Sequence, residues 1–107
     1  MATLSTHVLD TSRGRPAEGV RVELLSADGE VLGAGVTDAD GRVGRLGPDD
    51  LDLGDYVVRF DTGSWFAGLG VDAFYPEVRV AFVVAADEHF HVPLLLNPYG
   101  YSTYRGS

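Results

Sequence analysis

The segment HFHVPLLLNPYGYSTYRGS, residues 89–107, begins with eight residues that alternate between the two faces of an extended strand. One face of this strand must pack in a core, because it consists of Phe90, Val92, Leu94 and Leu96. The opposite face is also largely apolar and consists of His89, His91, Pro93 and Leu95. A sandwich strand with one solvated face is normally polar on that side. We therefore predict a β-sandwich in which another copy of the chain covers this second face.

Outward from this strand, glycine and aspartate interrupt the chain about every eight to twelve residues, a spacing typical of all-β sandwiches and barrels. Asp28-Gly29 indicates a hairpin. One segment, SWFAGLG at 64–70, suits a short helix with Ser64 as its N-cap. The apolar side of this helix would consist of Trp65, Phe66 and Leu69. The pattern predicts eight strands, at residues 3–10, 20–26, 30–37, 42–46, 56–61, 77–85, 89–96 and in the tail.

The composition is that of one globular domain, residues 1–107, with 45% hydrophobic and 22% charged residues. There is no cysteine, which excludes disulfides and thiolate zinc sites. The net charge is −8, so no nucleic-acid partner is expected, because nucleic acid requires a basic face. The chain shows no signal peptide, and no stretch approaches the roughly 18 apolar residues of a membrane span. We expect a cytoplasmic protein with no membrane partner.

The groups available for chemistry are the three histidines, the arginines and the carboxylates. His7 shares one face of the first predicted strand with Ser5 and Leu9. A lone histidine is more often structural than catalytic, and His89, beside two acidic residues, is expected to be exposed. The chain has no HExxH zinc motif and no GxSxG nucleophile turn. TDADG at 37–41 lacks the ligands of a calcium loop, so a hairpin turn is the simpler interpretation.

Several segments, in order along the chain, resemble the transthyretin-like family: STHVLDTSRGRPAEGV, TDADGR, GDYVVRFDTG, FYPE and HVPLLLNPYGYSTYRGS. The resemblance runs from Leu4 to Ser107. The terminal YRGS is its most specific element, because it is typical of the branch that hydrolyses 5-hydroxyisourate in urate breakdown. The resemblance implies a sandwich of two four-stranded sheets, with one short helix between the fifth and sixth strands. It also implies a homotetramer, a dimer of dimers, with the sites at the subunit interface.

The functional positions of the family, as the resemblance implies them, fall on matching residue types. The two catalytic histidines fall on His7 and His91, and the arginine of the DGR element falls on Arg42. All three are also expected to bind the substrate. The tail would add the substrate-binding residues Tyr104, Arg105, Gly106 and Ser107. We expect this tail to reach the site of a neighbouring subunit, and which histidine acts as the base stays open.

The implied reaction is hydrolysis of the N1–C6 amide bond of 5-hydroxyisourate to 2-oxo-4-hydroxy-4-carboxy-5-ureidoimidazoline. It requires no metal and no cofactor, because histidine supplies acid–base chemistry near neutral pH and arginine binds oxygen atoms that gain negative charge. An alternative is a transthyretin-type binding protein, which would carry a small ligand in the same fold without turnover. A structural sandwich module of a surface protein is a weaker alternative, because the sequence shows no signal peptide.

Overall fold

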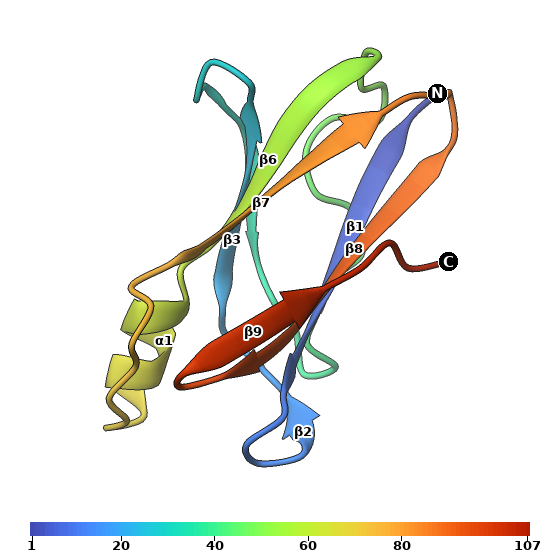
Figure 1. Cartoon of the computed structure of the whole chain (residues 1–107). Helices are drawn as coiled ribbons and strands as arrows, with labels where there is room; N and C mark the ends of the chain where they lie inside the picture. The colour runs from blue at the N-terminus through green and yellow to red at the C-terminus, as the bar shows by residue number, and fades with distance from the viewer.

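The computed structural model describes residues 1–107 as two β-sheets packed face to face, with one short helix at an end of the sandwich (Figure 1). The first sheet has the order β2-β1-β8-β9, with β5 also paired to β1, and the second has the order β4-β3-β6-β7. The predicted all-β sandwich with its single helix is confirmed, and the two-residue β2 is an additional strand. The elements are β1 (Thr3–Asp10), β2 (Arg15–Pro16), β3 (Arg21–Ser26), β4 (Val31–Val36), β5 (Arg42–Val43), β6 (Gly54–Phe60), α1 (Thr62–Gly68), β7 (Val78–Val84), β8 (His89–Asn97) and β9 (Gly100–Thr103).

A parallel pair of strands from opposite ends of the chain, β1 and β8, forms the centre of the first sheet. Leu4 lies opposite Phe90 and Val8 lies opposite Leu94, and these four side chains are buried between the sheets. Because successive side chains of a strand point to opposite faces, Ser5 and His7 of β1 and His91 of β8 lie on the outer face of the sandwich. This outer face carries the histidines.

The hairpin of β3 and β4 forms at the predicted Asp28-Gly29 turn. Gly29 has a φ of 88°, which glycine adopts without steric cost, and its N–H donates to the carbonyl oxygen of Ser26 at 2.9 Å. The N–H of Ser26 in turn donates to the carbonyl oxygen of Glu30 at 2.8 Å. The turn therefore joins β3 to β4, and the register of the pair shifts once beyond it, between Leu24 and Leu25.

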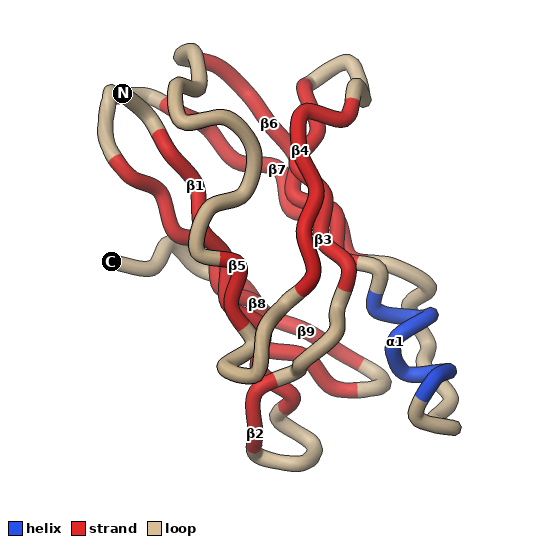
Figure 2. Tube along the Cα trace, turned by 180° about the vertical axis from the view of Figure 1, so that it is seen from behind, coloured by secondary structure: helices blue, strands red, loops and turns tan.

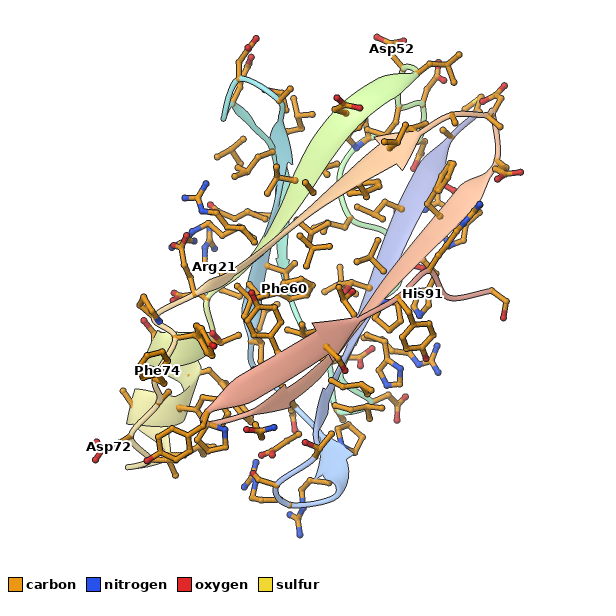
Figure 3. The ribbon with its side chains drawn as sticks, in the orientation of Figure 1. Arg21, Asp52, Phe60, Asp72, Phe74 and His91 are labelled. Atoms are coloured by element: carbon orange, nitrogen blue, oxygen red, sulfur yellow. The ribbon has the colours of Figure 1, made fainter.

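One core of nineteen buried residues fills the space between the two sheets. Phe60 of β6 and Leu94 of β8 are fully buried, and Phe66 of α1 is 2% exposed. Figure 3 shows Phe60 in the space between the sheets. Burial of each such side chain stabilises the fold by about 1.5–3 kcal/mol, so this shared core holds the two sheets together.

The helix begins before the predicted position. It covers Thr62–Gly68, no side chain caps it, and Ser64 lies inside it, so the predicted cap is wrong. Gly63 sets the early start: its N–H donates to the carbonyl oxygen of Pro76 at 3.0 Å, and a Cβ at this position would lie 2.5 Å from that oxygen. Leu69, expected on the apolar side, is 44% exposed. No helix of the chain is long and apolar enough to cross a membrane.

The predicted strand 42–46 is shorter than expected, because only Arg42–Val43 pairs as β5. This strand pairs with β1 and not with β4, so the interpretation of residues 37–41 as a hairpin turn is wrong. The turn instead carries the chain from one sheet to the other, as Figure 2 shows. After β5, Leu46 is buried and its N–H donates to the carbonyl oxygen of Leu4 in β1 at 2.9 Å, so the segment stays beside β1 after the strand ends.

Candidate active site

The parallel register of β1 and β8 brings two predicted site residues onto the outer face of the first sheet. Ser5 lies opposite His91, and His7 lies opposite Pro93. The rings of His7 and His91 are therefore neighbours, with centroids 6.5 Å apart, and both residues are partly buried. Figure 3 shows His91 beside the C-terminal segment and away from Phe60.

A tight turn places Arg42 next to this pair. The carboxylate oxygen Oδ1 of Asp38 accepts the N–H groups of Asp40 and Arg42, both at 2.9 Å. Gly41 has a φ of 76°, and a Cβ there would lie 2.3 Å from the carbonyl oxygen of Val8. Only glycine allows this approach, which puts Arg42 opposite the backbone of His7. The turn formed by the DADG sequence thus positions Arg42.

The end of the chain lies against His91. The N–H of Gly106 donates to the carbonyl oxygen of His91 at 2.9 Å, and a Cβ on Gly106 would lie 2.5 Å from ring atom Cδ2 of His91. Ser107 then reaches the same pocket as Arg42. Ser107 thus lines a pocket of its own chain, and the predicted contribution of the tail to a neighbouring subunit's site stays a prediction.

The other two tail residues lie elsewhere. Arg105 forms an ion pair with Glu88 at 2.5 Å, and its guanidinium lies 4.5 Å from the ring centroid of Phe90. Tyr104 and Arg105 line a second, largely apolar cavity of about 360 Å³ between β7 and β8. The structure therefore does not bring Tyr104 and Arg105 together with Arg42, and the contacts of Arg105 fasten the tail.

An open pocket of about 300 Å³ lies on the outer face at β1, β5, β8 and the chain end. Its polar lining includes Ser5, Arg42, His89, His91 and Ser107. His7 does not line this pocket and lies next to it through its contact with His91. No three histidine, aspartate or glutamate side chains are close enough together to hold a metal ion.

The charges of the pocket are arranged for a ligand. Of the eight arginines, six form an ion pair with a carboxylate, and Arg42 and Arg15 form none. Burial lowers the pKa of His91 below its usual value of 6.5, and the nearby His7 and Arg42 lower it further. At neutral pH, His91 is consequently a neutral base beside a free guanidinium group.

Sequence reasoning missed two residues that hold this site together. His89 is exposed as predicted, but its Nε2 lies 2.8 Å from the hydroxyl of Ser5, and that hydroxyl lies 2.7 Å from Nδ1 of His91. The pattern HxH near the end of the chain and SxH near its beginning could have suggested the cluster. Only the parallel pairing of β1 with β8 brings the two patterns side by side.

Comparison with known proteins identifies the family of this chain. The model of the HIUase/Transthyretin family matches residues 4–106. The chain belongs to this family. The 5-hydroxyisourate hydrolase of Salmonella dublin is 48% identical over 109 residues, which cover 97% of this chain and 80% of that protein. The family resemblance seen in the sequence is thereby confirmed.

Two solved structures of the family share the fold. The 5-hydroxyisourate hydrolase of Klebsiella pneumoniae is 48% identical, covers 100% of both chains and superposes with a TM-score of 0.93. Sea bream transthyretin in complex with thyroxine is 31% identical, covers 96% of this chain and 93% of its own, and has a TM-score of 0.87. In sequence, this chain is thus more similar to the hydrolases of Salmonella dublin and Klebsiella pneumoniae, at 48% identity each, than to the thyroxine-bound transthyretin, at 31%.

Proposed function

We propose that this chain is a 5-hydroxyisourate hydrolase of urate breakdown and that residues 1–107 act as one hydrolase domain. The observation that carries the proposal is the polar pocket in which Arg42, His91 and the chain-terminal Ser107 meet. The family hydrolases of Salmonella dublin and Klebsiella pneumoniae, each 48% identical, support the same activity. A protein that only carries a ligand has no need for a base beside an unpaired arginine.

The reaction opens the N1–C6 amide bond of 5-hydroxyisourate and requires a nucleophilic water and a proton for the departing nitrogen. His7 and His91 act as a pair around one water. One imidazole takes a proton as the water oxygen bonds to C6, and the imidazolium that results returns a proton to N1 as the C–N bond breaks. Proton transfers of this kind contribute typically about 10²–10⁴-fold to rate. The product is 2-oxo-4-hydroxy-4-carboxy-5-ureidoimidazoline, and the scheme uses only the side chains of this protein and water.

Arg42 binds the substrate and stabilises the negative charge that develops on the attacked carbonyl oxygen. Its guanidinium has no carboxylate partner in the chain, so no ion pair must break when the substrate enters. A planar, permanently charged group can hold two oxygen atoms at once. Ser107 lines the pocket at its end, and the tail is held there by the hydrogen bond of Gly106 to His91 and the ion pair of Arg105 with Glu88.

The working form is proposed to be a homotetramer, a dimer of dimers, with the sites at subunit interfaces. Two surfaces support this. β7 and β9 are each an edge strand of their sheet, opposite β4 and β2 at the other edges, and unpaired edges are templates for pairing with another chain. The outer face beyond the histidines is apolar at Leu95, which the chain itself covers only in part, whereas Pro93 is already buried within the chain. Sedimentation at micromolar concentration should give a tetramer, and a monomer would remove the interfacial site.

The activity is tested by following the absorbance of 5-hydroxyisourate made from urate by urate oxidase. With this protein present, the decay should accelerate in proportion to protein concentration and should saturate with substrate. The spontaneous decay, measured without protein, is the baseline. The His91→Ala variant at the same concentration is the control for the catalytic site. The transthyretin-type alternative predicts an unchanged decay, with at most stoichiometric binding of the substrate.

A further inference from the structure

Four side chains on the outer face of β1 and β8 form an unbroken chain of hydrogen bonds. Oγ1 of Thr3 lies 2.6 Å from Nδ1 of His89, Nε2 of His89 lies 2.8 Å from Oγ of Ser5, and that Oγ lies 2.7 Å from Nδ1 of His91. The parallel register supports the two outer links, since Thr3 is opposite His89 and Ser5 is opposite His91, and the middle link joins the two pairs diagonally. Nε2 of His91 has no partner among the side chains or the backbone, so the chain ends at the pocket.

A hydroxyl group between two imidazoles donates to one and accepts from the other, so this chain has two directions. In one direction, Nδ1–H of His91 donates to Ser5, and Nε2 presents a lone pair to the pocket. In the other direction, Ser5 donates to Nδ1 of His91, and Nε2 carries the proton. The direction therefore decides whether neutral His91 faces the pocket as a base or as an acid.

The first direction fits the chemistry of proton uptake. When Nε2 takes a proton, the imidazolium carries N–H groups on both nitrogens. The Nδ1–H donated to Ser5 is then already in place, and no hydroxyl has to turn during the reaction. In the opposite direction, Nε2 already carries a proton, so the imidazole takes up the second proton at Nδ1. The new Nδ1–H would then face the hydroxyl proton of Ser5, and the hydrogen bond between them would be lost.

We propose that Ser5 and His89 are positioning residues that hold neutral His91 with its proton on Nδ1 and its Nε2 lone pair directed to the pocket. This rests on the proposed function only for its catalytic consequence, since the tautomer is a property of the resting protein. Ser5 holds the ring, and His89, fixed by Thr3, holds the Ser5 hydroxyl in the donating orientation toward itself.

The surroundings of His91 contain other charges, which every pH measurement includes. These groups are His7 of β1, Arg42 of β5, His89 at the start of β8, Glu88 just before it, and Arg105 of the tail. None of them hydrogen-bonds a ring nitrogen of His91, whereas Ser5 does. Ser5 can therefore be changed without altering any formal charge.

The direct test is the ¹⁵N NMR spectrum of the histidine rings in the substrate-free protein, which contains only three histidines. Above the pKa of His91, the ring should show a protonated Nδ1 and an unprotonated Nε2. In Ser5→Ala, the ring should shift toward the Nε2–H tautomer that free histidine favours, whereas Ser5→Thr, which keeps the hydroxyl, should retain the original spectrum. An Nε2–H tautomer in the unaltered protein, or identical spectra for the protein and Ser5→Ala, would overturn the proposal.

Kinetics supply a second readout. Ser5→Ala should lower kcat by roughly 10- to 100-fold, as for other groups that orient a functional histidine, with a smaller change in KM. Ser5→Ala removes the hydroxyl beside Nδ1 of His91 and keeps the Ser5 backbone, whose hydrogen bond raises the pKa of His91, so the acid limb of its pH profile should move to lower pH only by the share of the hydroxyl. Ser5→Thr should restore both the rate and the limb. A loss of rate with an unmoved limb, or no rescue by threonine, would show a packing role only.

The two readouts separate this proposal from the proposed function. If the protein has no hydrolase activity, the proposed function fails, and the NMR spectrum still decides the tautomer of His91. If the protein is active and the tautomer is the predicted one in Ser5→Ala as well, the function stands and the role of Ser5 is refuted.

Discussion

The two sheets turn outward two faces that both carry arginine, and the arginines are used differently. On the face of β3, β6 and β7, Arg59 donates to Glu77 at 2.8 Å and to Glu23 at 3.0 Å. On the face of β1, β5 and β8, Arg42 has no carboxylate partner and lies among histidines. The paired arginine serves the fold, and the unpaired one is available to a ligand.

The pKa values follow the same division. Hydrogen bonds from Arg79 and Arg59 lower the pKa of Glu77, so this cluster stays ionised and paired over a wide pH range. Burial, with no carboxylate to offset it, lowers the pKa of His91 and keeps the ring neutral. One face is consequently fixed in its charged state, and the other can exchange protons near neutral pH.

The largest effect should come from the histidines. His91→Ala and His7→Ala should each lower turnover of 5-hydroxyisourate by at least about 10²-fold, the low end of acid–base catalysis. Both side chains lie on the outer face and outside the core, so circular dichroism should show an unchanged fold. Full activity in either variant would remove that histidine from the mechanism.

A change in the tail should lower the hydrolysis rate by a smaller factor. Gly106→Ala would place a Cβ 2.5 Å from Cδ2 of His91, so the ring or the tail must move. A displacement of about 1 Å at a site can cost up to about 10²-fold in rate. Gly100→Ala is the matched control, because its Cβ would meet the Asn97 side chain at an ordinary 3.7 Å. Equal rates in the two variants would mean that the tail contact does not matter.

The pH dependence should show the neutral state of His91. Because its pKa is below 6.5 in the folded protein, kcat/KM should hold as pH falls past that value and decline only at lower pH. The unfolded chain takes up this proton first, so the contribution of His91 to stability also decreases as pH falls through the usual value. An acid limb above 6.5 would contradict the assignment of His91 as the buried base.

The smallest effect should appear on the opposite face. Arg59→Ala removes two ion pairs that are only partly exposed, and such pairs contribute about 1 kcal/mol or less. The melting temperature should fall by a few degrees, measured by calorimetry at constant protein concentration. A loss large enough to prevent folding would mean that this face holds the sandwich together more strongly than surface ion pairs do elsewhere.

The sequence was informative where the alternation of residues within one strand shows which side chains face the core. The alternation at 89–96 predicted both the core residues and the outer position of His91, and the family resemblance supplied Arg42 and the tail. The hydrogen bonds of Ser5 and His89 were not predictable in this way, because they depend on which strands pair. Parallel pairing of the two ends of the chain leaves no turn between them as a local signature.

The remaining errors have a similar cause. The helix starts early because Gly63 packs against Pro76, a contact thirteen residues ahead that no capping rule includes. The turn at 37–41 resembles a hairpin locally. However, Gly41 packs against the backbone of Val8, and the strand that follows, β5, pairs with β1 in the other sheet. Local patterns gave the elements, and long-range backbone contacts decided their ends and their partners.

The most direct test of the division between the two faces is the hydrolysis rate of Arg42→Ala beside that of Arg59→Ala, under the same conditions and at the same protein concentration. The account predicts that Arg42→Ala loses at least about 10²-fold in kcat/KM, as for loss of a group that stabilises an oxyanion, while Arg59→Ala keeps the rate of the unaltered protein. Equal losses in the two variants, or full activity in Arg42→Ala, would contradict the claim that the unpaired arginine and its histidines form the catalytic site.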